Sequence, residues 1–106
     1  MPFSTPDLSD ENPEVKALSP ILKNLGGKKV FWGKIETLKC PNDNSFVKEL
    51  LNLEGSGKVL VVDANAINTV ALLGDMIAEA GVKNNWSGVV INGYIRDVDI
   101  VETLDI

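Results

Sequence analysis

Histidine is absent from the 106-residue sequence, and cysteine occurs once, as Cys40. The lack of histidine excludes the Ser-His-Asp and Cys-His mechanisms of nucleophilic enzymes and the usual histidine-rich transition-metal sites. Acid-base chemistry must therefore come from Asp, Glu, Lys, Tyr or Arg side chains, or from a metal-bound water. Oxygen ligands favour hard cations, Mg²⁺ or Mn²⁺. A single cysteine forms no internal disulfide, as is typical of a reducing compartment.

Long hydrophobic runs and an excess of positive charge are also lacking. No apolar stretch approaches the roughly 20 residues of a membrane span, and the N-terminus lacks the basic and apolar regions of a signal peptide. We therefore expect a cytoplasmic protein without a membrane partner. The net charge of −5 argues against direct nucleic-acid binding through phosphate neutralisation. The same charge is compatible with binding to basic protein segments.

The order of the apolar segments predicts a single α/β domain. Strand, helix, strand, helix, strand is the expected sequence of elements, which favours layers and parallel pairing. Strands are expected at residues 30–40, with a bend at Gly33, and at 59–62 and 88–91. Residues 70–73 fit either a strand or a helix.

Capping residues and helical spacing predict the helices. Ser4 or Thr5 is expected to cap a turn over residues 7–11, and Ser19-Pro20 to open a short helix that Gly26-Gly27 stops. Apolar spacing predicts two further helices, one over 46–53 and one that starts near Gly74 and buries Met76, Ile77, Ala80 and Val82. A last element is expected to contain Ile100, Val101 and Leu104.

The most informative motif pairs Asp75 with the dipeptide Arg96-Asp97, twenty residues further on. Each lies just beyond an apolar run, where the chain leaves a packed core. The set supplies two carboxylates and a guanidinium, and a guanidinium fork matches the two oxygens of a carboxylate. Gly74 would let an anion approach the free amides at a helix start. The motif therefore predicts a site for a divalent cation and a small oxoacid.

Structural explanations compete with this interpretation. Arg96-Asp97 could be a surface ion pair, and Asp75 a first-turn carboxylate that meets the helix dipole. Asp63 and Asn65 follow an apolar strand, but a polar turn explains them slightly better. Lys39 as a Schiff-base lysine is disfavoured, because nothing nearby in the sequence would lower its pKa.

Four segments of the chain resemble the RraA-like family, which contains class II 4-hydroxy-4-methyl-2-oxoglutarate aldolases and the regulator of ribonuclease activity A. They are 31–40 followed by Asp43-Asn44, 57–63, 71–75 and 86–99. Each segment alone is weak evidence, but the four occur in order and in register over about residues 27–106. The resemblance implies a swivelling β/β/α-type layered domain, with a mixed sheet and flanking helices. It also implies a homotrimer with sites at the subunit interfaces.

The resemblance also implies roles for individual residues. Arg96 and Asp75 would be catalytic, Asp97 would hold the metal, and the substrate-binding residues would be Leu73, Gly74, Asp75 and Arg96. Aldolases of this family carry the acidic residue after the arginine, whereas regulators of the ribonuclease type lack it, so Asp97 favours an aldolase. Family members usually continue beyond the point that matches Ile106, and the 1–106 domain is therefore expected to be truncated at its C-terminus.

The expected activity is metal-dependent cleavage of 4-hydroxy-4-methyl-2-oxoglutarate, or of a related 4-hydroxy-2-oxoacid, to pyruvate and a second oxoacid. Oxaloacetate decarboxylation is expected as a second activity because it forms the same pyruvate enolate. The alternative is a regulator that binds and inhibits an RNA-degradation endonuclease. The two functions are compatible.

Overall fold

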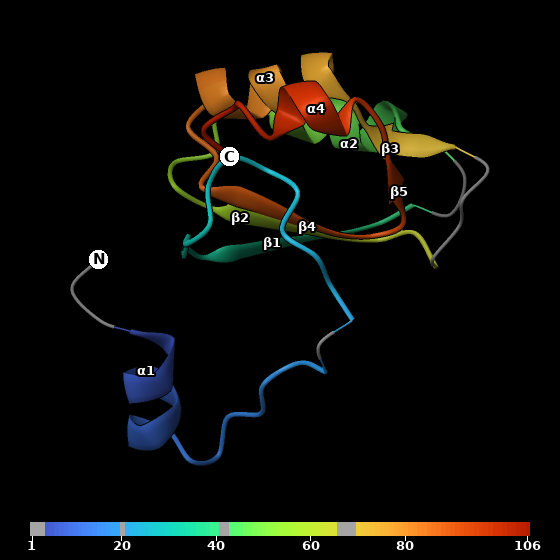
Figure 1. The fold of residues 1–106 in the computed structure, drawn as a ribbon. Helices are drawn as coiled ribbons and strands as arrows, with labels where there is room; N and C mark the ends of the chain where they lie inside the picture. The colour runs from blue at the N-terminus through green and yellow to red at the C-terminus, as the bar shows by residue number, and fades with distance from the viewer. Residues whose placement is uncertain (1–3, 20, 41–42, 66–69) are drawn as a thin grey trace.

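The fold consists of two sheets, each made of parallel strands, and a group of helices (Figure 1). The computed structural model describes residues 4–19, 21–40, 43–65 and 70–106. The larger sheet has the order β1-β2-β4, formed by β1 (Ile35–Lys39), β2 (Val59–Asp63) and β4 (Gly88–Asn92). The smaller sheet pairs β3 (Ala71–Leu73) with β5 (Tyr94–Ile95). Every strand pair among the described residues is parallel, and the alternation of strands and helices predicted parallel pairing. The mixed sheet that the family resemblance implied is not found among these residues, since none of their strand pairs is antiparallel.

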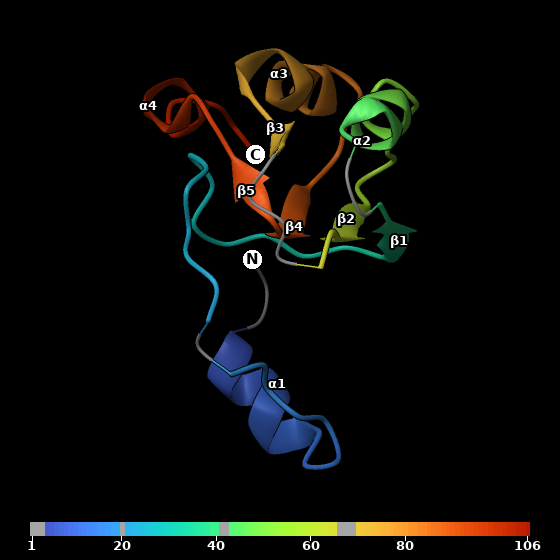
Figure 2. The same cartoon turned by 90° about the vertical axis from the view of Figure 1, so that its right-hand side faces the viewer.

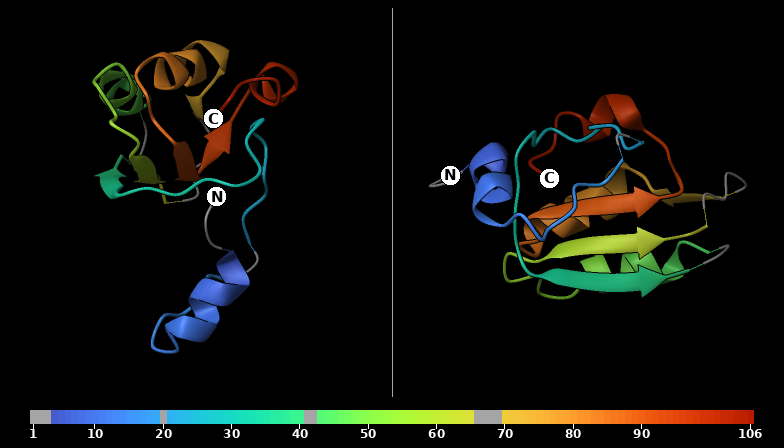
Figure 3. Two further views of the ribbon diagram at one scale, coloured as in Figure 1. Left: turned by 90° about the vertical axis from the view of Figure 1, so that its left-hand side faces the viewer. Right: turned by 90° about the horizontal axis from the view of Figure 1, so that it is seen from below.

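On one side of the larger sheet lie the small sheet and three helices (Figure 2). The helices are α2 (Ser45–Leu51), α3 (Asp75–Lys83) and α4 (Val98–Val101). The larger sheet thus has the small sheet and the helices on one of its sides, which confirms the predicted α/β layered class. Helix α1 (Thr5–Glu11) stands away from these layers at the end of an extended arm (Figure 3). Within the described ranges, no helix is long and apolar enough to cross a membrane.

The core lies between β2 and the helices. Leu60 and Val62 of the central strand are fully buried, as are Val47 and Leu51 of α2. A continuous apolar run is typical of a parallel strand that is covered on both faces. Gly81 of α3 also lies close to the C-terminal residue, because a Cβ at Gly81 would lie 2.7 Å from Cδ1 of Ile106.

Two predicted elements differ from the observed ones at the N-terminal side. Residues 21–25 form no helix, and the Pro20 expected to start one lies outside the described residues. Ile21 is 80% exposed, so a short helix there would bury little and short helices need tertiary packing to form. The strand expected over 30–40 is limited to β1, because its partner β2 begins only at Val59. The backbone before β1 passes close to the Gly57 carbonyl at Gly33, where the bend was expected.

The remaining differences concern helix ends and faces. The helix predicted over 46–53 ends at Leu51, and Leu53 is 57% exposed. The expected apolar face of α3 is wrong at Met76, which is 79% exposed, whereas Ala78 is fully buried. Residues 71–73 form a strand, which resolves the ambiguity left by their composition. The predicted Ser4 cap is confirmed, since its hydroxyl accepts the Asp7 N–H at 3.2 Å.

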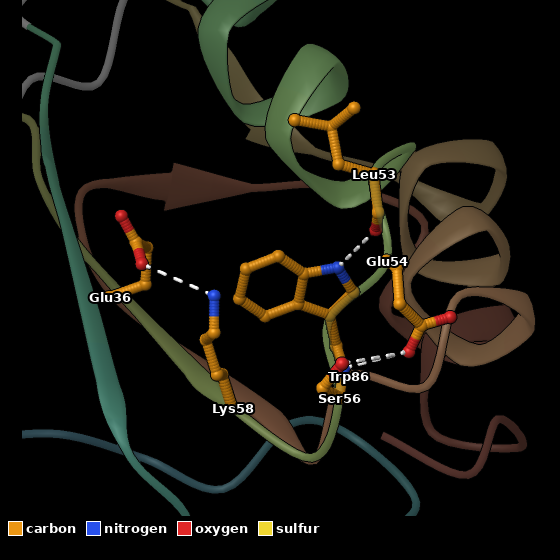
Figure 4. Close-up of polar contacts among 6 residues, drawn as sticks. All are labelled: Glu36, Leu53, Glu54, Ser56, Lys58 and Trp86. Carbon is orange, nitrogen blue, oxygen red and sulfur yellow. Dashed lines mark hydrogen bonds and ion pairs between the residues drawn. The ribbon is translucent and has the colours of Figure 1, made fainter.

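Hydrogen bonds of Glu54 and Trp86 join the connection between α2 and β2 to the connection between α3 and β4 (Figure 4). The Trp86 indole N–H donates to the Leu53 carbonyl at 3.0 Å. The Glu54 carboxylate accepts the Ser56 backbone N–H at 2.8 Å and the Asn85 amide at 3.1 Å. These hydrogen bonds stabilise the charged carboxylate, so the pKa of Glu54 lies below its ordinary value, with the Ser56 N–H as the largest cause.

The lowered pKa of Glu54 predicts a pH-dependent contribution to stability. Because the folded-state pKa is below the unfolded one, the contribution is present above the unfolded pKa and is lost as pH falls through the folded pKa. Glu54→Gln should therefore unfold at lower urea concentration than the wild type at pH 7, and this difference should shrink as pH falls below the ordinary pKa of a glutamate side chain. Urea titrations at several pH values measure it, and a difference independent of pH would contradict the assigned cause.

Candidate functional site

The candidate site forms where β3 and β5 end side by side. Leu73 is the last residue of β3 and pairs with Ile95, the last residue of β5. The Arg96 backbone N–H then donates to the Leu73 carbonyl at 3.0 Å. The twenty residues between Asp75 and Arg96 contain the rest of α3, β4 and β5, and they return the chain to the end of β3. The structure thus brings together the two halves of the motif singled out in the sequence.

Asp97 joins the two halves through one carboxylate oxygen. Its Oδ2 accepts the Asp75 backbone N–H at 3.4 Å and lies 3.7 Å from Nε of Arg96. The Asp97 backbone is left-handed, with φ 58°, a conformation that Asp tolerates better than most residues. Its carbonyl accepts the N–H groups of Ile100 and Val101, so Asp97 also begins α4.

Gly74 gives this arrangement its space. A Cβ at this position would lie 2.9 Å from Oδ2 of Asp97 and 3.2 Å from Nε of Arg96. The Gly74 φ of −132° is extended and open to any residue, so the requirement concerns volume and not backbone conformation. Gly74 is also the residue before the first turn of α3, where the Asp75 N–H donates to Asp97.

Asp75 occupies the first position of α3 and is partly exposed. Its Oδ1 accepts the Met76 N–H at 2.9 Å, and the dipole at a helix N-terminus favours such a negative charge. Leu73 differs from the other predicted site residues because its side chain is only 5% exposed and belongs to the core. The Arg96 side chain is 70% exposed and the Asp97 side chain 37%, so both are open to a ligand.

A small cavity of about 50 Å³ adjoins these residues. Its lining includes Gly74, Asp75 and Arg96 and adds Asn44. Asn44 was named in the sequence analysis only as part of a segment that resembles the family, with no place in the site. Asp43 instead makes the local capping contacts, to the N–H and the hydroxyl of Ser45, and Asn44 makes no side-chain capping bond at α2.

A larger cavity of about 780 Å³ lies on the other side of β5. Its lining is mostly apolar, with a few amide and lysine side chains, and includes Leu73 and Ile95. The carboxylates of Asp75 and Asp97 are not among its lining residues. Asp75 and Arg96 line the smaller cavity, whereas Asp97 is among the lining residues of neither cavity.

The other residues considered in the sequence have structural partners. Oδ1 of Asp63 accepts the Asn65 N–H at 2.9 Å and the Asn92 amide at 3.2 Å, and these bonds lower the pKa of Asp63. This pattern is the polar turn that the sequence analysis favoured. Cys40 is 1% exposed, and burial raises the pKa of its thiol, with smaller contributions from Asp43 and Asp63. A neutral, buried thiol is a poor nucleophile.

No group of three or more His, Cys, Asp or Glu side chains gathers as a metal site within the residues described. A cation here would therefore have protein ligands from Asp97, with Asp75 nearby, and would complete its shell with water and substrate. Mg²⁺ usually binds in this way, through one or two carboxylates and several waters.

The chain is similar to proteins of several Pseudomonas species. A protein of Pseudomonas fluorescens (strain Pf0-1) is 53% identical over 105 residues, which cover 98% of this chain and 64% of that protein. A protein of Pseudomonas syringae pv. tomato is 51% identical over 107 residues, covering 100% of this chain and 66% of that protein. Both carry the provisional name 4-hydroxy-4-methyl-2-oxoglutarate aldolase. The chain thus spans slightly less than two thirds of these relatives.

Solved structures show the same fold. The RNA-processing inhibitor RraA from Thermus thermophilis has a TM-score of 0.91 and 36% identity, and the match covers 100% of this chain and 65% of that one. A protein named S-adenosylmethionine: 2-dimethylmenaquinone methyltransferase, from Geobacillus kaustophilus HTA426, has a TM-score of 0.89 and 33% identity, with 98% and 65% covered.

The family model described as RraA-like, Aldolase/RraA, matches residues 5–106, which is nearly the whole sequence. The four segments noted in the sequence all lie within this match. The chain belongs to the RraA-like family.

Proposed function

We propose that the protein is a metal-dependent class II aldolase. It cleaves 4-hydroxy-4-methyl-2-oxoglutarate, or a related 4-hydroxy-2-oxoacid, to pyruvate and a second oxoacid. The observation that carries the proposal is the meeting of Arg96, Asp97 and the start of α3 around Gly74. The provisional names of the Pseudomonas relatives support the same substrate.

Substrate binding depends on Arg96 and on the first turn of α3. The exposed guanidinium of Arg96 binds the carboxylate next to the keto group, and its planar fork fixes the orientation of that carboxylate. The N–H groups at the start of α3 add positive potential, and Gly74 lets the anion come close. The residues on the small cavity, including Asn44 and Asp75, then surround the rest of the substrate.

Asp97 is the residue that would hold the cation, with Mg²⁺ or Mn²⁺ as the expected ion. Both suit oxygen ligands, and the small number of nearby carboxylates suits an ion that keeps much of its water. When bound, such a cation withdraws electrons from the keto group of the substrate and stabilises negative charge.

Asp75 and Arg96 support the bond cleavage itself. Asp75 orients the water that takes the proton from the 4-hydroxyl group, as its position at the cavity allows. The electron pair of that O–H bond forms the new carbonyl, the C3–C4 bond breaks, and its electrons form the enolate of pyruvate. Arg96 stabilises the enolate charge. Protonation at C3 gives pyruvate, and loss of CO₂ from oxaloacetate leads to the same enolate.

A regulatory function is the second candidate, and one observation favours it. The structure of the RNA-processing inhibitor RraA from Thermus thermophilis has a TM-score of 0.91 with this chain. The net charge of −5 suits docking on a basic segment of an RNA-degradation endonuclease. Failure to retain such an endonuclease on a column of the immobilised protein would remove this candidate.

The proposed setting is a homotrimer in the cytoplasm, with sites at the subunit interfaces. Exposed apolar side chains that line the larger cavity, such as Tyr94 at 51% and Leu22 at 44%, are the kind of surface that a subunit interface covers. Analytical ultracentrifugation tests this assembly, and a monomer at all concentrations would exclude it.

The direct test of the proposed activity measures pyruvate released from oxaloacetate and from 4-hydroxy-4-methyl-2-oxoglutarate. Release should occur with Mg²⁺, stop with excess EDTA and return when Mg²⁺ is added again, because the cation would then again withdraw electrons from the keto group of the substrate. Absence of release from both substrates, by folded and assembled protein with Mg²⁺, would favour the regulatory function instead.

Removal of the Asp97 carboxylate should affect turnover strongly. We expect Asp97→Ala to lower kcat/KM by at least about a hundredfold, which corresponds to about 2.7 kcal/mol of lost transition-state stabilisation. Asp99→Ala is the matched control, since it removes the same charge two positions away and should keep near-normal kcat/KM. Similar activities of the two variants would argue against the assigned function of Asp97.

Added volume at Gly74 should disturb the site without unfolding the protein. A Cβ on Gly74 displaces the Asp97 carboxylate and the Arg96 side chain, both of which are partly exposed and able to move. Gly74→Ala should therefore lower kcat/KM about tenfold while the melting temperature changes little, because Ala suits the extended backbone at this position. Unchanged kinetics would show that the close approach at Gly74 is unimportant for turnover.

A further inference from the structure

The Asp97 carboxylate already contacts two groups that would bind the substrate anion. Its Oδ2 accepts the Asp75 N–H, the first amide of α3, at 3.4 Å, and it lies 3.7 Å from Nε of Arg96. Both partners are anion-binding groups in the proposed function. One carboxylate oxygen of the protein therefore stands where the negative charge of a substrate would be attracted.

A second carboxylate strengthens this effect. Oδ1 of Asp75 accepts the next amide of α3, that of Met76, at 2.9 Å. The first two N–H groups of the helix are thus both engaged by carboxylates of the protein itself. Like charges close together repel, so these carboxylates lower the affinity of the helix start and of Arg96 for an added anion.

We propose that Asp97 is an internal competitor that blocks the oxoacid site until a cation binds to it. This inference rests on the proposed function and adds an order of binding, cation first and oxoacid second. A cation held by Asp97 cancels the charge that repels the substrate carboxylate. The same residue then changes from a barrier to oxoacid binding into a requirement for it.

The geometry around Asp97 suits a residue with two functions. Its left-handed backbone places the carboxylate over Gly74, where any larger residue would collide with Oδ2 at 2.9 Å. The Asp97 side chain is 37% exposed, so a cation can reach it from solvent. Neither of its contacts is short, and a weak contact is one that a cation can replace.

The proposal predicts that removing the Asp97 charge improves anion binding in the absence of metal. The probe is oxalate, a planar dianion that resembles the enolate of pyruvate, titrated calorimetrically into protein stripped of metal on a chelating resin. Asp97→Asn should bind oxalate at least about fivefold more tightly than the metal-free wild type, which is the scale of one exposed ion pair. Asn keeps the shape of the side chain and tolerates the left-handed backbone.

Three comparisons make the test specific. Asp99→Asn removes the same net charge from the neighbouring turn and should bind oxalate as the wild type does. Mg²⁺ should tighten oxalate binding to the wild type and have little effect on Asp97→Asn. Metal-free binding by Asp97→Asn that equals or falls below that of the wild type would overturn the proposal, as would an equal gain in Asp99→Asn.

The activity of the wild type separates this inference from the proposed function. If Mg²⁺-dependent pyruvate release is present but Asp97→Asn gains no metal-free affinity for oxalate, Asp97 is not an internal competitor. The proposed aldolase activity is then unaffected. If no pyruvate is released and the wild type with Mg²⁺ does not bind oxalate, both are wrong.

Discussion

The candidate site depends on one backbone hydrogen bond, from the Arg96 N–H to the Leu73 carbonyl, made where two short parallel strands end together. Parallel strands are joined by crossover connections, and here α3 and β4 return the chain to the end of β3. The bond fixes Arg96 beside the start of α3. Asp97 follows at once, and its left-handed backbone turns the carboxylate back over Gly74.

The close approach at Gly74 links the fold to the chemistry. The site has few charged groups, and they have more than one structural function. Asp97 contacts both Asp75 and Arg96, and Asp75 is also the first residue of α3. A single carboxylate can therefore influence both cation binding and anion binding. Such sharing is expected in a protein without histidine, where carboxylates and a guanidinium must supply the functions that imidazole supplies elsewhere.

Sequence reasoning succeeded where the signal is local or repeated, and failed where tertiary contacts decide. The apolar runs that became β2 and β4, the Ser4 cap and the motif of Asp75 with Arg96-Asp97 were all identifiable from residue type and spacing. The helix expected after Ser19 did not form because its side chains have little to pack against, and Met76 was assigned to the wrong face of α3. Asn44 was missed as a cavity residue because its nearness to Asp75 and Arg96 depends on how α2 packs against β3 and α3.

The central claim is that Asp97 holds a divalent cation at the oxoacid site. Its most direct test is a Mn²⁺ titration followed by electron paramagnetic resonance, in which bound Mn²⁺ loses the signal of the free ion. The account predicts that the wild type and Asp99→Asn bind Mn²⁺ with similar affinity and that Asp97→Asn does not. Equal Mn²⁺ binding by wild type and Asp97→Asn would contradict it.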